Sequence, residues 1–253
     1  MVTSNLVGGL GNYLFQIATT YSLALDNGVD AIFDDKSSVT VHKHLDFYKT
    51  NILRNLVYDI PFIKSHYNEP FFHYQKIPYK ENIKINGYYQ SEKYFKHNRD
   101  IILDLFSINT PNKMYIEKKY GNILKNKTCS IHVRRGDYLG LPNHHPSCSL
   151  NYYSEAMSQM DVDKFLVFSD DINWCKENFT SDKFIFIEDN PDYIDLWLMS
   201  LCDNNIIANS SFSWWGAWLN QNPTKKVVTP NKWFGPAIRH NTKDLIPKKW
   251  IKI

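Results

Sequence analysis

The stretch that decides the fold is SIHVRRGDY, residues 130–138. Ile131 and Val133 suit a buried strand, and Gly136 suits a sharp exit from it. Two guanidinium groups at the end of a strand are costly to hold together unless an anion lies between them, and each presents a planar fork of donors that matches phosphate oxygens. The pair therefore indicates an anion site. The competing interpretation is that one arginine pairs with a neighbouring carboxylate and the other lies in water.

From this strand outward, the second half of the chain alternates strands with helices. Short apolar runs rich in β-branched and aromatic residues predict strands at 128–133, 165–168, 184–187, 205–208 and 227–228. Helical spacing predicts helices from 151 to about 160, around Trp174, from Pro191, and through Trp214 and Trp215, whose indoles we expect in the core. The order βαβαβαβ predicts a parallel, doubly wound sheet.

The first half begins with a predicted strand at 3–7, the turn GGLGN at 8–12, and a helix that runs to Gly28. Such a turn aims backbone N–H groups and a helix N-terminus at an anion, but a tight strand-to-helix connection explains it equally well. Further along we expect a strand at 29–34, a helix at 47–56, a strand at 83–89, a helix capped by Ser91 and another from Thr110. The polar, basic segment 118–127 is the predicted domain boundary, which separates residues 1–122 from residues 123–253.

Composition excludes several classes of protein. The chain has 253 residues, 43% of them hydrophobic, and a net charge of +3, too small to make nucleic acid the main partner. Four cysteines without C-x-x-C spacing argue against a zinc site and a disulfide framework, and histidines 42, 44, 66 and 73 have no metal-ligand spacing. No signal peptide and no apolar run of about 18 residues is found, so we expect a cytoplasmic protein without a membrane span, although peripheral contact with a membrane stays open.

The unusual motifs all follow predicted strands, where ligands of open α/β sheets bind. Arginines 134 and 135 can neutralise the phosphates of a nucleotide diphosphate, and the hydroxyls and N–H groups of residues 210–213 can add neutral hydrogen bonds to them. A carboxylate at Asp170 or Asp171 can accept two N–H donors from a guanine edge. Helix capping explains these aspartates, and the serines at 211 and 213, about as well.

Four segments resemble one family. They are GGLGNYLFQ (8–16), HVRRGDY (132–138), FSDD (168–171) with WCKEN (174–178), and SFSWWGAWL (211–219), and GYYQSEKYF (87–95) is similar to a segment of bacterial members. In this order they resemble the alpha-1,2-fucosyltransferases, the GDP-fucose-dependent inverting enzymes of glycosyltransferase family 11. One departure is Tyr13, which stands where glutamine is usual and bears on the acceptor side.

The resemblance implies a GT-B type α/β fold, two Rossmann-like domains with a cleft between them and the N-terminal one trimmed. Residues 1–122 would form the acceptor-side domain and residues 123–253 the GDP-fucose-binding domain. It also implies transfer of L-fucose to a galactose-containing glycan, in alpha-1,2 linkage, with inversion and without a metal or other cofactor. The acceptor would be chosen by loops at 36–78 and 139–150.

Matched by motif, the catalytic residues would be Arg134 and Asp137. Arg134 would be the main contact of the β-phosphate, supported by Arg135. Asp137 would act as the general base or only hold Arg135 in place. Donor binding is predicted for Gly9, Gly11, Asn12, His132, Arg134, Arg135, Asp170, Asp171, Ser210, Ser211, Phe212 and Ser213, with His132 and an aspartate near guanine. The alternatives are a transferase for another GDP-sugar, a non-catalytic glycan-binding protein, and a nucleotide-binding regulator, which the lack of a Walker lysine disfavours.

Overall fold

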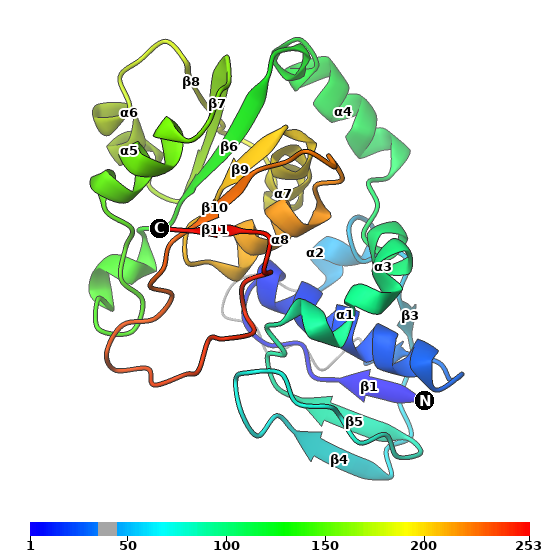
Figure 1. The fold of residues 1–253 in the computed structure, drawn as a ribbon. Helices are drawn as coiled ribbons and strands as arrows, with labels where there is room; N and C mark the ends of the chain where they lie inside the picture. The colour runs from blue at the N-terminus through cyan, green and yellow to red at the C-terminus, as the bar shows by residue number, and fades with distance from the viewer. Residues whose placement is uncertain (35–44) are drawn as a thin grey trace. The chain divides into compact units, whose positions relative to one another are not determined.

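The computed structural model describes residues 1–34 and 45–253, which form two compact units (Figure 1). Unit 1 comprises Met1–Asn109 and His240–Pro247, and unit 2 comprises Thr110–Arg239 and Lys248–Ile253. The division falls before α4 (Thr110–Tyr120) and not at residue 122, because α4 packs on α7 (Asp192–Leu201) of unit 2. The return of residues 240–247 to unit 1 was not foreseen either.

Unit 2 contains a six-stranded parallel sheet with the order β11-β10-β9-β6-β7-β8. Its strands are β6 (Thr128–Val133), β7 (Lys164–Ser169), β8 (Phe184–Phe186), β9 (Asn204–Ile206), β10 (Val227–Thr229) and β11 (Ile251–Lys252). The predicted doubly wound parallel sheet is confirmed. The sequence did not reveal β11, because it is a short edge strand with exposed side chains and no apolar alternation.

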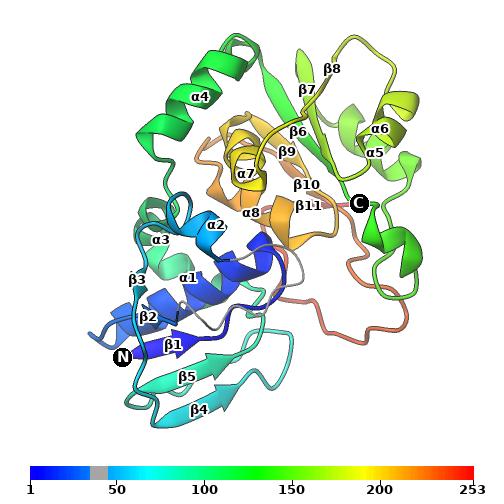
Figure 2. The same ribbon diagram turned by 180° about the vertical axis from the view of Figure 1, so that it is seen from behind.

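Helices cover both faces of this sheet (Figures 1 and 2). On one face lie α5 (Leu150–Ser158) and α6 (Ile172–Asn178), and on the other lie α7 and α8 (Ser211–Leu219). Single 3₁₀ turns occur at Ile123–Lys125 and Asp137–Gly140. Trp214 and Trp215 are fully buried on α8, which confirms that they are core residues.

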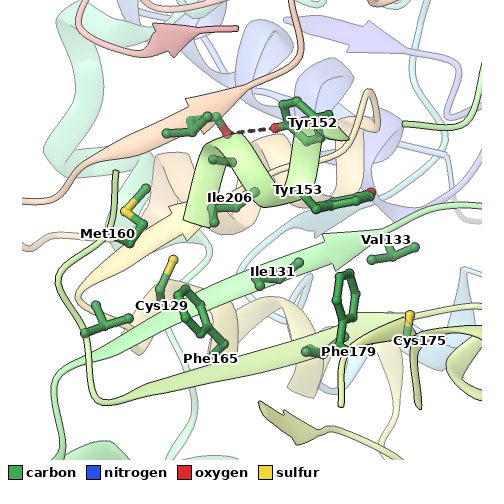
Figure 3. Close-up of a cluster of buried hydrophobic side chains, with 14 residues drawn as sticks. Cys129, Ile131, Val133, Tyr152, Tyr153, Met160, Phe165, Cys175, Phe179 and Ile206 are labelled. Atoms are coloured by element: carbon green, nitrogen blue, oxygen red, sulfur yellow. Dashed lines mark hydrogen bonds between the residues drawn. The ribbon is translucent and has the colours of Figure 1, made fainter. Parts of the chain in front are cut away.

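The face beneath α5 is held by apolar packing and by two buried tyrosines (Figure 3). The Tyr152 hydroxyl donates to the carbonyl oxygens of Ile207 (2.6 Å) and Val228 (3.3 Å). The Tyr153 hydroxyl donates to the carbonyl oxygen of His132 (3.2 Å). Buried carbonyls need such partners, so α5 fixes the carboxyl ends of the central strands, from which the polar motifs emerge.

Unit 1 has a three-stranded parallel sheet in the order β1-β5-β4, formed by Val2–Ser4, Ile83–Asn86 and Ser65–Asn68. A second pair of parallel strands, β2 (Ile32–Phe33) and β3 (Val57–Tyr58), connects to β1 through one bridge between Val2 and Ala31. The helices are α1 (Leu10–Asp26), α2 (Asp46–Lys49) and α3 (Arg99–Leu105), with 3₁₀ turns at Glu92–Tyr94 and Lys96–Asn98. Its sheets are smaller than that of unit 2, as the predicted trimmed N-terminal domain requires.

Two predictions in unit 1 were wrong in detail. The expected helix at 47–56 is only the single turn α2, because the Asn51 side chain donates to the carbonyl of Phe47 and the hydroxyl of Thr50 and competes with helical bonding. Ser91 caps a 3₁₀ turn, and α3 begins only at Arg99. Strands β3 and β4 were missed because they are short and half-exposed, and β4 (SHYN) is polar.

Candidate active site

The strand order of unit 2 reverses direction between β6 and β9. The chain proceeds from β6 through β7 to β8 on one side, and then returns to place β9 and β10 on the other. Loops that leave two such strands diverge and open a crevice at the carboxyl edge, where ligands of α/β sheets bind. Three predicted motifs lie there: the arginines after β6, Asp170 and Asp171 after β7, and the serines after β9.

Arg134 lies between two carboxylates. Its Nη2 contacts Oδ1 of Asp137 at 2.8 Å, and its Nη1 contacts Oδ2 of Asp170 at 3.1 Å. The interpretation in which Asp137 only holds Arg135 is therefore wrong, because its partner is Arg134. With both terminal nitrogens engaged, the guanidinium plane is fixed at the end of β6.

Arg135 is held by a different set of groups. Its Nε contacts Oδ2 of Asp171 at 3.0 Å, its backbone N–H donates to Oδ1 of Asp170 at 2.9 Å, and its Cζ lies 4.0 Å from the centre of the Trp174 ring. Asp171 also caps α6, since its Oδ1 accepts from the backbone N–H of Trp174. The capping explanation is correct for Asp171, and both aspartates are bound to arginines in this structure.

Gly136 makes this arrangement possible. A Cβ at position 136 would lie 2.6 Å from Oδ2 of Asp170, the oxygen that contacts Arg134. Any larger residue would therefore push Asp170 away from the guanidinium.

His132, the next-to-last residue of β6, is buried and uncharged. Burial, together with the positive charge of Arg134, lowers its pKa to about 3, and the negative charge of Asp170 opposes this only in part. Its ring lies 5.6 Å from that of Phe212, and its Nδ1 has no hydrogen-bond partner among the described residues. A neutral imidazole with an unused nitrogen can bind a polar heterocycle without adding charge.

The four residues at the start of α8 have different roles. Ser210 caps the helix by accepting from the backbone N–H of Phe212, and Ser213 is fully buried with its hydroxyl directed to the carbonyls of Ala208 and Ser210. Ser211 and Phe212 are half-buried. The side chains of Ser210 and Ser213 thus serve the helix start, and the half-buried pair remains for a ligand.

Sequence reasoning missed several groups that support this corner. Asn209 donates its amide to the carbonyls of Pro146 and Trp233, each at 2.9 Å, and so fastens the long loop after the arginines. Tyr138 donates its hydroxyl to the Asn209 carbonyl at 3.0 Å, stacks on His145 and lies beneath Arg134. Nothing in local sequence signals these partners, because 24 to 71 positions separate the hydrogen-bonded residues.

In unit 1 the glycine turn lies where the strand order reverses between β1 and β5. Gly8 has φ +88°, which disfavours a side chain, and a Cβ there would lie 2.4 Å from Nδ2 of Asn12. Gly9 is the N-cap of α1 and supplies no side-chain bond, while Gly11 is buried. The Asn12 Oδ1 accepts from Nε2 of Gln90 at 2.8 Å, so the turn after β1 is bonded to the loop after β5.

Tyr13, the departure from the family pattern, lies in the core of unit 1. Its ring is buried and packs edge-on to Tyr48 at 6.3 Å, and burial raises the pKa of its hydroxyl to about 12. The substitution therefore changes the core of unit 1.

No group of three or more metal-ligating side chains occurs within residues 1–34 and 45–253, and no helix in those ranges is long and apolar enough to cross a membrane. Histidines 42 and 44, and part of the predicted acceptor loop 36–78, lie outside the described residues. All four cysteines are free, and three of them are buried, as expected for core residues.

A family model described as glycosyl transferase family 11 matches residues 1–253, the whole chain. The chain belongs to glycosyl transferase family 11. An alpha-1,2-colitosyltransferase of Escherichia coli is 32% identical to this family 11 chain and aligns with 100% of it and 99% of its own length. The galactoside alpha-(1,2)-fucosyltransferase 2 of Bos taurus is 26% identical over 87% of this chain and 69% of its own.

Among solved structures, that of the NodZ alpha-1,6-fucosyltransferase soaked with GDP-fucose superposes with a TM-score of 0.57 at 13% identity, covering 86% of this chain and 92% of that one. This likeness shows the fold, and it confirms the predicted GT-B type with Rossmann-like units. The protein is a glycosyltransferase, so the hypothesis of a non-catalytic glycan-binding protein is not retained.

Proposed function

We propose that this family 11 enzyme transfers L-fucose from GDP-fucose to a galactoside hydroxyl, in alpha-1,2 linkage, with inversion at the anomeric carbon and without a metal. The observation that carries the proposal is the fixed guanidinium of Arg134 at the reversal point of the sheet, 29% exposed and flanked by the half-buried start of α8. The names of the relatives, alpha-1,2 transferases of 6-deoxy sugars, support the same linkage and sugar class.

In the proposed reaction an acceptor oxygen forms a bond to the anomeric carbon while the bond to the β-phosphate breaks. Negative charge then builds up on the departing GDP, and the guanidinium of Arg134 stabilises it, as a divalent cation does in other transferases. Arg135 can contribute as well, because its contacts use Nε and leave its terminal nitrogens without a partner among the described residues.

The two carboxylates on Arg134 differ in how firmly they are held. Asp170 is 25% exposed and also accepts from the Arg135 backbone, whereas Asp137 is 49% exposed. With three aspartates around two arginines the corner carries a net negative charge, so an incoming phosphate must replace a carboxylate. We propose that the phosphate displaces Asp137, whose carboxylate then becomes the general base for the acceptor hydroxyl.

The neutral groups complete the proposed donor site. His132 and Phe212 would contact guanine, and the α8 start would contact the phosphates through Ser211. In this proposal Asp170 stays bound to Arg134 and Arg135, so we no longer expect it to contact guanine. The glycine turn of unit 1 would donate the backbone N–H groups of Gly9 and Gly11 and the side-chain amide of Asn12 to a substrate, since the backbone N–H of Asn12 is bonded to the Gly9 carbonyl.

The experiment is GDP release from GDP-fucose with a panel of galactosides, in EDTA, followed by linkage and anomeric analysis of the product. We expect EDTA-resistant release and an alpha-1,2-fucosyl galactoside. Loss of activity in EDTA that Mg²⁺ or Mn²⁺ restores would contradict metal independence, and a beta product would contradict inversion.

Asp137→Asn tests the base. If Asp137 removes the proton, the acidic limb of the pH–rate profile disappears and kcat falls by about a hundredfold or more. A variant that keeps this limb and loses only GDP affinity would leave Asp137 as an ion-pair partner.

A second donor is favoured by the colitosyltransferase relative, which aligns with the whole chain. Colitose lacks the hydroxyl at carbon 3 of fucose but has the same methyl group at carbon 5. Competing the two GDP-sugars at equal concentration measures the ratio of kcat/KM values and assigns the donor.

A further inference from the structure

We propose that the carboxyl edge of the unit 1 sheet binds the acceptor galactoside, with the rings of Phe71 and Tyr88 on its apolar face and the amides of Asn5, Asn86 and Asn68 on its hydroxyls. This inference rests on the proposed function and adds the residues that recognise the acceptor. The residues come from the loops or positions that directly follow β1, β4 and β5.

The three asparagines form a ladder across the sheet. Each follows or ends a strand, and Nδ2 of Asn5 donates to Oδ1 of Asn86 (3.3 Å), whose Nδ2 donates to Oδ1 of Asn68 (3.1 Å). The contact between Asn86 and Asn68 is exposed to solvent. Amides are neutral and both donate and accept, so this edge suits hydroxyl groups and lacks the positive charge that a phosphate needs.

The loop after β5 exposes one ring from an otherwise buried segment. Tyr88 is 44% exposed, whereas Tyr89 and Ser91 are fully buried and Gln90 is nearly so. Tyr89 has φ +51°, which is unfavourable for a bulky residue. Backbone strain of this kind persists where the surroundings enforce it, and it is frequent at ligand sites.

Glu69, the residue that follows β4, enforces this conformation. Its Oε2 accepts from the backbone N–H of Tyr88 (2.8 Å), and both of its oxygens accept from that of Tyr89 (3.1 and 3.2 Å). The Tyr89 hydroxyl donates back to the carbonyl of Asn86 (3.1 Å). A carboxylate used entirely on a backbone holds Tyr88 in place beside the amide ladder.

The loop after β4 is connected to the loop after β5 through Asp244. Its Phe71 ring is 57% exposed and stacks on His73 with centroids 5.2 Å apart. Asp244 accepts from the Tyr74 backbone (3.2 Å), pairs with Lys93 (2.6 Å), and its carbonyl accepts from the Ser91 hydroxyl (2.7 Å). Asp244, whose side chain is 9% exposed, thus joins both loops, so the rings of Phe71 and Tyr88 are preorganised and lose little freedom on binding.

The chemistry of this edge is that of a saccharide site. The C–H face of a galactose ring packs on aromatic rings, and its hydroxyls pair with amides. A nucleotide would require cations for its phosphates, and the ion pair of Lys93 with Asp244 leaves that lysine neutralised.

The test compares Tyr88→Ala, Phe71→Ala and Tyr88→Phe with the wild-type enzyme. The control is Phe62→Ala, which removes a ring that is 69% exposed in unit 1 but follows β3. The KM for the best galactoside of a panel that includes lactose and methyl β-galactoside is measured at saturating GDP-fucose. Hydrolysis of GDP-fucose without acceptor reports on the donor site alone.

We expect each alanine variant at 71 and 88 to raise the acceptor KM by about tenfold, while Tyr88→Phe and Phe62→Ala stay within about twofold. Donor hydrolysis and the melting temperature should not change, because both side chains are exposed. Acceptor KM values within twofold of wild type in both alanine variants would overturn the subsite. A wild-type enzyme that hydrolyses GDP-fucose but transfers to no galactoside would also overturn it. Failure of the wild-type enzyme to bind GDP would instead overturn the proposed function.

Discussion

The carboxyl edges of the two sheets use opposite chemistries. In unit 2 two arginines and three aspartates form a network of direct ion pairs around β6. In unit 1 the edge carries neutral amides, exposed rings and a carboxylate, Glu69, which is used on backbone N–H groups. The difference teaches that one topology can carry either fixed guanidiniums or rings and amides at its carboxyl edge; in our proposal the first suit a charged leaving group and the second an uncharged acceptor.

The largest expected effect comes from Arg134→Ala. Removing a preorganised donor to developing charge lowers kcat by about a hundredfold or more, measured as GDP release at saturating substrates. Arg134→Lys should recover little of this, because an ammonium is a point charge and cannot contact Asp170 and the phosphate side by side as the planar guanidinium does. If the alanine variant turned over like the wild type, the charged edge would have no part in the chemistry.

Two glycines provide a matched pair of smaller changes. In Gly136→Ala the new Cβ meets Asp170 at 2.6 Å, and in Gly87→Ala it meets the Cβ of Glu69 at 2.4 Å. We expect the first to weaken GDP binding by about tenfold and the second to raise the acceptor KM by a similar factor, since each displaces the carboxylate that organises its edge. If both variants changed the GDP affinity and the acceptor KM by the same factors, the two edges would not have separate roles in donor and acceptor binding.

The pH dependence of stability tests the buried histidine of unit 2. Because the pKa of His132 is lowered to about 3 in the native protein, the unfolded chain takes up a proton below about pH 6.5 and the native protein does not. The free energy of unfolding should therefore fall by up to about 1.4 kcal/mol per pH unit between pH 6 and pH 4 on this account.

Urea unfolding of His132→Asn at several pH values should show a shallower decrease than the wild type. The control His66→Asn makes the same substitution at an exposed histidine on β4 and reports its effect outside the core. Parallel curves for the wild type and His132→Asn would mean that His132 takes up a proton in the native protein as readily as in the unfolded chain.

The smallest effect is expected for Gln90→Ala, which removes the hydrogen bond to Asn12 between the two loops of unit 1. Loss of one neutral hydrogen bond costs about 1 kcal/mol, so we expect about a fivefold decrease in kcat/KM. Gln90→Glu keeps an oxygen but loses the donor, and its kcat/KM should match that of the alanine variant.

Sequence reasoning worked best where pattern and topology coincide. The boundaries of β6 were predicted without error, since the β-branched residues Ile131 and Val133 favour a strand and the charged Arg134 follows its end. Motifs at strand ends converge in any parallel sheet, so the grouping of the arginines, Asp170 and Asp171, and the start of α8 at one edge could be predicted before the structure.

What could not be predicted depends on partners distant in sequence. Which carboxylate contacts Arg134 is settled by three-dimensional packing, since Asp137 and Asp170 lie on different loops. The same holds for Glu69, whose role requires that β4 and β5 be neighbours. The sequence did not predict β4, because its residues SHYN show no apolar alternation. Short polar edge strands and side-chain-to-backbone bonds leave no local pattern.

The excursion of residues 240–247 has a consequence for biosynthesis. Asp244, which binds Tyr74, Ser91 and Lys93, is translated after residues 110–239 of unit 2. Unit 1 therefore cannot complete its folding on the ribosome ahead of unit 2, although it contains the first strand. A chimera that exchanges acceptor specificity by one junction between the halves would lack the contacts of Asp244 with unit 1. Such a chimera must therefore also exchange residues 240–247.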